Sequence, residues 1–553
     1  MIRVVIDTNI FISALLQPNG PPAQILVLAL ASENVRLCIS ADVYAEYEEV
    51  IRRPKFKRSE NEITDVLRAI REQGLWVKPS QKVRACSDPD DDILLECAQA
   101  SHAHFLVTGN LKHFPPSWGR YEDRDRPSVS GYLNPYFNLL AEEERAPRLE
   151  AQKEFATGLE LFYSNPTAAI VHVKRAAEID HDFFWPRYLL AYSINNSGKI
   201  AEAVAQLDAV EKTQNLTALQ RSRVAWLRAN IGGRSEEVYS IARDIVRRVP
   251  EEHINSIDVA VGGSWSNRPR DAVENFKTLR GPPFFTPSNT FGLYFLQQWT
   301  DALHLLGEHE EELQEARWGK GLYPHLLNAY AYEVRALVAL GRLEEADRLI
   351  DEILAMPSTW SYTSCCLPHG TPGYVMLNAA EELRTHDHRD AALRMADRAV
   401  DWYRSRVGGE AKDEDTRSNL GEGLYRAERW QEAEAVFRAL SAEHPGNIFY
   451  QGRLGTLAAR RGERARALQI AEKLRRNETP YLYGNHTFRS ARITALLGEK
   501  ERAVALLRDA VAQGSGTEEE SDSYGYGFIY PHSMDLESLH GYPPFEELIK
   551  PKD

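Results

Sequence analysis

The sequence of 553 residues has only five cysteines, and none of them forms a Cys-x-x-Cys pair or stands at a Cys/His ligand spacing. The cysteines therefore indicate neither a disulfide framework nor a zinc site, and we expect them to be small buried side chains. They are Cys38, Cys86, Cys97, Cys365 and Cys366.

Long apolar runs are also lacking, since none reaches the ~18 residues that suggest a membrane span. The N-terminus has neither the basic flank nor the small-residue cleavage site of a secretory signal. We therefore expect a cytoplasmic protein that does not contact membranes.

Positive charge is in the minority: 66 Lys and Arg oppose 80 Asp and Glu, which gives a formal net charge of -14. Affinity for phosphates comes mainly from clustered Lys and Arg, so this balance argues against indiscriminate binding of nucleic acid but allows a local basic track. GxxxxGK, HExxH and GxSxG motifs are absent, so the phosphate-loop, zinc-protease and serine-hydrolase classes are not indicated.

The first residues, MIRVVIDTNIFI, contain a short β-branched run that ends at Asp7. Such a run is typical of a buried strand in a parallel sheet, and ligands of these sheets bind beyond the carboxyl ends of the strands. Further strands are expected at 35–39, 75–77 and 105–107. Helices are expected between them, at 23–30, 41–51, 63–73 and 91–100. This alternation predicts an α/β domain with a parallel sheet.

Four motifs in order resemble a PIN domain, a small metal-dependent ribonuclease fold. They are Asp7-Thr-Asn after the first strand, the helical segment 40–56 with Glu46, the Asp-rich segment 88–98, and Thr108-Gly-Asn within 105–115. The resemblance covers about a fifth of the chain. It implies a three-layer α/β fold and the toxin component of a bacterial toxin-antitoxin pair as nearest relative.

The resemblance also implies a Mg²⁺ or Mn²⁺ site in which Asp7, Glu46 and Asp91 are catalytic metal ligands, with Asp88 and Asp92 as further candidate ligands. Hard divalent cations choose carboxylate oxygens and water. A bound ion would activate water for attack on a phosphodiester and leave 5'-phosphate and 3'-hydroxyl ends. Residues expected to bond to these carboxylates or to water are Thr8, Asn9, Thr108 and Asn110.

Each acid taken alone has a structural alternative. Asp88 and Asp91 precede a helix and could be N-cap or first-turn residues, while Glu46 could belong to a solvated face. Asn110 departs from the Asp found in many PIN nucleases and would hold a second metal less tightly, although a similar subgroup also has Thr-Gly-Asn.

The densest basic run of this domain follows the Glu46 helix. Arg52, Arg53, Lys55 and Lys57 could follow an RNA backbone, with Phe56 as a stacking face, or form a solvated helix end. Lys112 and His113 could contact the scissile phosphate, although a lone loop His is more often a surface residue.

Beyond the domain, the pattern is helical and repetitive. A Gly-x4-Ala spacing recurs at Gly198, Gly341, Gly462 and Gly498, and Glu428 keeps the frame in place of Gly. Intervals near ~34 residues resemble tetratricopeptide repeats, which imply a concave surface that binds a protein or peptide. The expected domains are a PIN-like nuclease at 1–118, a linker at 119–140, repeats at 141–520 and a C-terminal capping tail at 521–553.

These observations predict a metal-dependent endoribonuclease, acting on RNA, that is recruited or controlled by a tetratricopeptide solenoid. The solenoid's partner would be a protein or peptide, an antitoxin being one candidate. The alternative is a non-catalytic interaction scaffold with a degenerate PIN-like domain. A third possibility is that the chain is a fusion of two halves that share no function.

Overall fold

The computed structural model of the protein describes residues 2–16, 21–31, 35–56, 58–103, 105–109, 113–114, 149–161, 166–212, 216–249, 253–281, 285, 292–357, 370–407, 414–515 and 525–553. The chain divides into two compact units, Met1–Val224 and Ala225–Asp553, which are considered separately below. The predicted linker lies outside the described residues, so the expected domain boundaries at 118 and 140 stay predictions.

The first unit begins with a four-stranded parallel sheet in the order β3-β2-β1-β4. The strands are β1 (Ile2–Ile6), β2 (Val35–Ile39), β3 (Leu75–Trp76) and β4 (Phe105–Val107). β1 and β2 are central and most of their side chains are buried, as the β-branched and apolar composition predicts. The predicted α/β fold with a parallel sheet is confirmed.

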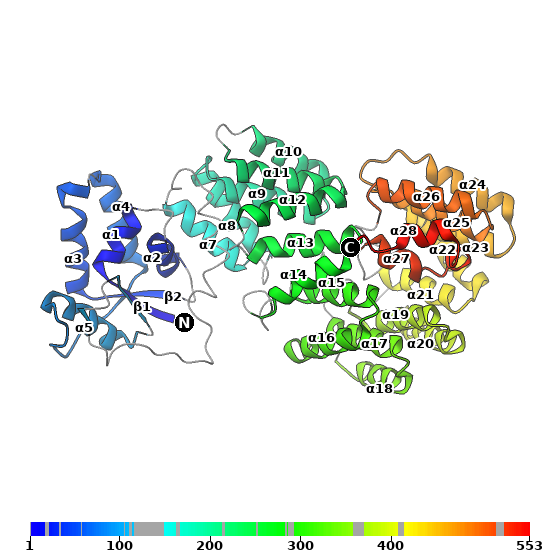
Figure 1. The fold of residues 1–553 in the computed structure, drawn as a ribbon, viewed down its shortest axis with the longest axis horizontal. Coiled ribbons are helices and arrows are strands. Elements are labelled where there is room, and N and C mark those ends of the chain that lie inside the picture. The colour runs from blue at the N-terminus through cyan, green and yellow to red at the C-terminus, as the bar shows by residue number, and fades with distance from the viewer. Residues whose placement is uncertain are drawn as a thin grey trace. The chain divides into compact units, whose positions relative to one another are not determined.

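In the described part of this domain, five α-helices accompany the sheet (Figure 1). They are α1 (Thr8–Leu16), α2 (Pro21–Ala31), α3 (Ala41–Ile51), α4 (Glu60–Gln73) and α5 (Asp92–Ser101), with short 3-10 turns η1 (Pro54–Phe56) and η2 (Pro89–Asp91). Ser40 caps α3 by accepting the N–H of Val43, and Ser59 and Glu62 form a reciprocal capping box on α4. α1 was not expected from the sequence. It begins directly after Asp7, which places that residue at the N-terminus of a helix.

The remaining elements are helical. Within the first unit and across its boundary they are α7 (Leu149–Leu161), α8 (Pro166–Ile179), α9 (Phe184–Asn196), α10 (Ile200–Glu211) and α11 (Ala218–Ile231). In the first unit α7 packs against α2, so the first helix described after the predicted linker contacts the α/β domain.

The second unit continues with helices that pack pairwise along the chain (Figure 1). They are α12 (Ser235–Arg248), α13 (His253–Trp265), α14 (Pro269–Thr278), α15 (Gly292–Leu305), α16 (His309–Leu322), α17 (Leu327–Ala339), α18 (Leu343–Leu354), α19 (Pro372–Thr385), α20 (Arg389–Val407), α21 (Glu414–Arg426), α22 (Trp430–Glu443), α23 (Ile448–Arg460), α24 (Arg464–Arg475), α25 (Asn485–Leu496) and α26 (Lys500–Ala512).

The predicted Gly-x4-Ala spacing coincides with the turns between paired helices. Gly462 and Gly498 have φ values of 77° and 79°, the left-handed region that ends a helix. The alanines five residues later are fully buried, which is where two helices approach closely. Glu428 takes the same turn position with φ 60°, so the repeat frame is kept without glycine. The predicted all-α repeat architecture is confirmed.

The C-terminal segment folds onto this helical array as α27 (Tyr526–His532), η6 (Glu537–Leu539) and α28 (Pro543–Ile549). Tyr530, Leu539 and Phe545 are buried together with side chains of α25 and α26. The chain end reaches farther, because the side-chain amide of Asn267 donates to the carbonyl oxygens of Ile549 and Lys550, each at 2.9 Å. The segment thus covers the last helix pair and also contacts the region between α13 and α14.

Two further observations concern composition. Cys38 and Cys97 are buried and Cys86 is partly buried, all as free thiols, while Cys365 and Cys366 lie outside the described residues. None of the helices in the described ranges is both long and apolar enough to cross a bilayer.

Candidate active site of the α/β domain

Asp7 stands between the carboxyl end of β1 and the first turn of α1, and its side chain is almost completely buried. Asp7 Oδ1 accepts the backbone N–H of Asn9 at 2.9 Å, and Asp7 Oδ2 accepts the hydroxyl of Thr108 at 2.5 Å. Thr108 follows β4, the strand paired with β1. Two adjacent strand ends therefore fix the orientation of this carboxylate.

Glu46 lies in the middle of α3 and directs its carboxylate toward the same region. Its Oε2 atom is buried and has no hydrogen-bond partner among the residues that the structure describes. Burial raises the pKa of Glu46; contact with the Thr8 side chain opposes this rise, while the negative charges of Asp7 and Asp91 add to it. Glu46 is thus a buried oxygen donor within the electrostatic reach of the other two acids.

Asp91 comes from a different element, the end of η2 that leads into α5. Its Oδ2 lies 2.8 Å from Nδ1 of His113, and Oδ2 of Asp88 lies 3.9 Å from the same nitrogen. Burial raises the pKa of Asp91; contact with His113 opposes this rise, while the charges of Asp7 and Asp88 add to it. His113, for which a surface position was the favoured expectation, is therefore a direct contact of Asp91.

Asp7, Glu46 and Asp91, the three acids predicted from sequence, are near enough to interact electrostatically. The ligand atoms that lie within 4.8 Å of one another are those of Asp88, Asp91 and His113. The charge of Asp7 raises the pKa of both Glu46 and Asp91, and the buried carboxylate of Glu46 adds a further oxygen donor. An oxygen-rich donor set of this kind suits a hard divalent cation such as Mg²⁺ or Mn²⁺. The residues present fit the metal that the sequence motifs imply.

Two other predicted acids have local partners. Asp92 Oδ1 accepts the backbone N–H groups of Cys86 and Ala85 at 2.9 and 3.0 Å, and these hydrogen bonds lower its pKa. Asp88 Oδ1 accepts the N–H of Asp90 at 3.2 Å and so caps η2. Asp92 therefore anchors the segment before α5, whereas Asp88 is both a cap and a neighbour of His113.

The predicted residues around the carboxylates differ in what they contribute. The buried hydroxyl of Thr8 lies beside the carboxylate of Glu46 and lowers its pKa. The side chain of Asn9 is exposed, and only its backbone binds Asp7. Asn110, Lys112 and Lys57 lie outside the described residues, so their predicted roles stay predictions.

The basic run after α3 is largely ion-paired. Arg52 pairs with Glu48 and Glu60, and Arg53 pairs with Glu49 at 3.0 Å, all on the surface. Lys55 is exposed and its Nζ lies 4.8 Å from the ring centroid of Phe56. Exposed pairs of this kind contribute little to stability and exchange partners at low cost, so the arginines remain accessible to phosphates.

Two residues that support the site were not predicted. The buried hydroxyl of Tyr47 donates to the carbonyl oxygen of Ile6, and its ring stacks on Phe11 with centroids 4.2 Å apart. Buried Glu96 accepts the N–H of Val83 and the ammonium of Lys82, both at 3.0 Å. A tyrosine or glutamate within an apolar helical pattern gives no sequence signal for such distant backbone contacts.

Comparison with known proteins identifies the α/β region. Residues 3–112 match the family model of the PIN domain. The uncharacterized protein MJ1680 of Methanocaldococcus jannaschii is 35% identical over 112 residues, which are 20% of this chain and 71% of that protein.

Solved structures similar to the helical part include a tetratricopeptide repeat protein from Parabacteroides merdae. It is 16% identical, and the match covers 51% of this chain and 93% of the Parabacteroides chain, with a TM-score of 0.29. Another is the human IFIT1 dimer with PPP-AAAA, which is 14% identical. The match covers 60% of this chain and 76% of the IFIT1 chain, with a TM-score of 0.27.

Proposed function

Because the chain belongs to the PIN-domain family through residues 3–112, we propose that this region is a metal-dependent endoribonuclease. The single observation that supports the activity is that Asp7, Glu46 and Asp91, which come from three separate elements, lie within electrostatic reach of one another. Acids used only as helix caps would be spread over the surface and bonded to their own helices.

Each residue of the proposed site has a distinct task. Asp7, held by Thr108 and the N–H of Asn9, would be the fixed ligand of a Mg²⁺ or Mn²⁺ ion. Glu46 and Asp91 would complete the oxygen donor set, and His113 would orient Asp91 through the contact at 2.8 Å. The ion, when bound, supplies charge neutralisation and an activated water for phosphodiester hydrolysis.

The proposed substrate is RNA with accessible single-stranded or loop segments. Lys55 and Phe56 offer an exposed cation and ring near α3, and Arg52 and Arg53 are surface guanidiniums that phosphate oxygens could recruit from their present carboxylate partners. Single strands suit such a surface because their bases are free to stack on an aromatic ring.

The helical repeats would bind a protein or peptide that recruits or restrains the nuclease, an antitoxin being one candidate. The packing of α7 against α2 supports a physical link between the repeats and the α/β domain. A covalently attached scaffold in contact with a nuclease suggests control within the chain or through a bound protein.

The test is cleavage of a mixed RNA pool by the full chain with Mn²⁺, Mg²⁺ or a chelator. The proposal predicts metal-dependent cutting that is lost in Asp7→Asn and Asp91→Asn. Asp92→Asn is the matched control, because Asp92 bonds to backbone N–H groups and its amide can still accept one of them. Absence of cutting by the full chain, or cutting that survives Asp7→Asn, would favour the non-catalytic scaffold.

A further inference from the structure

The second unit contains a cluster of histidines and glutamates at the junction of α15, α19 and α27. His304 is near the end of α15, Glu382 and His386 are at the end of α19, and His532 ends α27. The side chains of His304 and Glu382 are each 4% exposed, and that of His532 is 11% exposed. These residues are far from one another in sequence, so no ligand spacing marks them.

The ligand atoms of His304, Glu382 and His386 all lie within 4.8 Å of one another, and His532 joins this group through its contact with His304. His304 Nε2 is 3.3 Å from Glu382 Oε1 and 3.3 Å from His532 Nε2, and His386 Nε2 is 2.8 Å from Glu382 Oε1. Tetrahedral ligands that are each ~2.0–2.1 Å from zinc are about 3.4 Å from one another.

Two of these atoms form no hydrogen bond of standard geometry with the residues that the structure describes. Glu382 Oε1 and His386 Nε2 are both buried, and neither makes a hydrogen bond, although they approach each other closely. A buried carboxylate oxygen without a donor is costly to maintain. An ion placed between them would satisfy both atoms.

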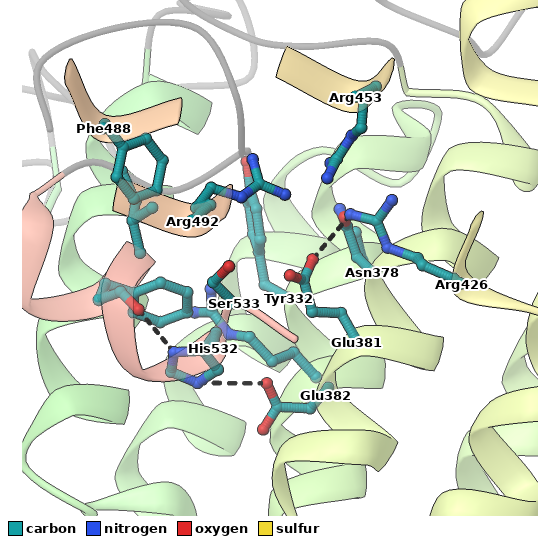
Figure 2. Close-up of a pocket in the computed structure, with 14 residues that line it drawn as sticks. Tyr332, Asn378, Glu381, Glu382, Arg426, Arg453, Phe488, Arg492, His532 and Ser533 are labelled. Carbon is teal, nitrogen blue, oxygen red and sulfur yellow. Dashed lines mark hydrogen bonds and ion pairs between the residues drawn. The ribbon is translucent and has the colours of Figure 1, made fainter. Parts of the chain in front are cut away.

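The outer contacts of the histidines fix which ring nitrogen faces the cluster. His532 Nδ1 lies 2.7 Å from the carbonyl oxygen of Phe528, which can only accept, so Nδ1 has the proton and Nε2 presents a lone pair (Figure 2). His304 Nδ1 likewise lies 2.9 Å from Oε2 of Glu312. The Nε2 atoms of His304 and His532 lie 3.3 Å apart, so a proton on His304 can be donated to the lone pair of His532. A divalent ion would replace that proton and use both nitrogens as ligands.

The surrounding contacts match the outer environment of protein metal ligands. Metal-bound histidines usually donate their second N–H to a carboxylate or a backbone carbonyl, as His304 and His532 do here. Glu312 is in turn held by Nε of Arg335 at 2.8 Å. Asp301 and Glu312 both pair with this single arginine. Glu382 instead lies beside His304, His386 and His532, where a divalent ion would balance its charge.

We propose that His304, Glu382, His386 and His532 form a structural site for a divalent transition-metal ion of the zinc class. Four protein ligands and burial are typical of structural rather than catalytic zinc. The ion would fasten α27 to α15 and α19. Glu382 and His532 also line a cavity, so the cluster borders an open space (Figure 2).

The test uses the full chain with Asp7→Asn, so that the α/β site does not contribute. After treatment with a chelator, the chain is titrated with Co²⁺, whose visible spectrum reports tetrahedral coordination, and then with Zn²⁺ in competition. We expect one equivalent of Co²⁺ to bind and to give the visible spectrum of tetrahedral coordination. The bound ion should also raise the midpoint of thermal unfolding of the second unit. His386→Gln and His532→Gln should weaken zinc binding by more than the roughly 10- to 100-fold that loss of an outer contact costs.

Matched controls separate a lost ligand from a lost fold. His444→Gln replaces a half-exposed histidine that pairs with Glu414 elsewhere in the unit, and it should bind zinc like the parent. His386→Cys should retain Co²⁺ and add a thiolate charge-transfer band, which only a direct ligand can give. Circular dichroism verifies that each variant is folded.

Two results would overturn the proposal. One is equal zinc affinity in His386→Gln, His532→Gln and His444→Gln, in which case a proton on His304 is the only cation of the cluster. The other is loss of binding in His309→Gln with retention in His386→Gln. That outcome would place the ion at the alternative group of His304, His309 and Glu312.

Discussion

At the scale of single residues, the orientation of Asp7 depends on Thr108, which is 101 positions away in the sequence. The hydroxyl at the end of β4 donates to Asp7 Oδ2, while the backbone of Asn9 donates to Oδ1. A carboxylate held in this way does not have to lose rotational freedom when it binds a metal. The threonine therefore contributes to affinity without being a ligand.

Thr108→Val should separate this positioning role from metal ligation. Valine has the same shape but no hydroxyl, so we expect about 10- to 100-fold weaker Mn²⁺ binding, while Thr108→Ser should remain near the parent. Isothermal titration of each full-length variant with Mn²⁺ measures this difference. Equal affinity of the valine and serine variants would contradict the role assigned to the hydroxyl.

At the scale of elements, the repeat turns depend on backbone conformation more than on side-chain contacts. Gly498 and Gly446 would each place a new Cβ in open space, with no atom within 4 Å. Only Gly498 has a left-handed φ, at 79°. The two positions form a matched pair that isolates the cost of that conformation.

Gly498→Ala should therefore lower the free energy of unfolding of the second unit by about 1–2 kcal/mol, the cost of a left-handed alanine. Gly446→Ala should be neutral or slightly stabilising, because it only restricts the unfolded chain. Urea titration followed by circular dichroism gives both values. Equal destabilisation by the two substitutions would show that turn conformation is not the cause.

The C-terminal element is held by one buried acid. Asp535 accepts from Arg492 at 2.6 Å, from Arg460 at 2.7 Å and from the hydroxyl of Tyr425 at 2.5 Å. Burial alone would raise the pKa of Asp535, but Arg492, Arg460 and Arg453 outweigh it and hold the pKa far below its ordinary value. The carboxylate therefore stays charged below its ordinary titration range and balances the charge of the surrounding guanidiniums, of which Arg453 also pairs with Glu422.

Asp535→Asn should destabilise the second unit by about 3–5 kcal/mol at pH 7, because it removes the carboxylate charge that three largely buried arginines share. A folded pKa below the unfolded value of about 3.9 means that the stabilisation is complete above that pH and declines as the pH falls below it. The difference in the free energy of unfolding between parent and variant, measured by urea titration, should therefore become smaller from pH 7 to pH 3. Exposed Asp509→Asn serves as the control, and a difference that does not depend on pH would contradict the account.

The sequence predicted those features that depend on local pattern. The β-branched run before Asp7, the acids at strand and helix ends, and the glycines between paired helices each leave a short-range signature, and the structure has them where expected. The contacts of Tyr47 with Ile6 and of His532 with His304 join distant segments, so neither periodicity nor spacing indicates them. α1 was missed because its start, Thr8-Asn9, was interpreted only as part of the metal motif.

At the scale of the whole molecule, each unit has its own chemistry. The first contains the proposed nuclease site, and the second contains a helical array closed by its own C-terminal segment. In the second unit, residues of 525–553 contact helices as distant in sequence as α12, where the ammonium of Lys552 pairs with Glu236. The segment is thus part of the fold of the array and not an appended tail.

Removal of residues 525–553 should loosen the array well beyond α26. Asp535 would no longer neutralise Arg453, Arg460 and Arg492, and Asn267 would lose its two carbonyl acceptors. We expect faster amide hydrogen exchange in α13–α14 and α23–α25, with exchange in the α/β domain unchanged. Faster exchange confined to α25 and α26 would instead show that the segment only covers the last helix pair.

The most direct test of the central claim is the chemistry of the RNA ends that the full chain produces with Mn²⁺. If Asp7, Glu46 and Asp91 position an activated water, cutting in ¹⁸O-water should give 3'-hydroxyl ends and 5'-phosphates that contain the label. Cyclic phosphate ends without label would mean that the RNA 2'-hydroxyl is the nucleophile. That result, or no cutting at all, would contradict the proposal that these acids form a hydrolytic metal site.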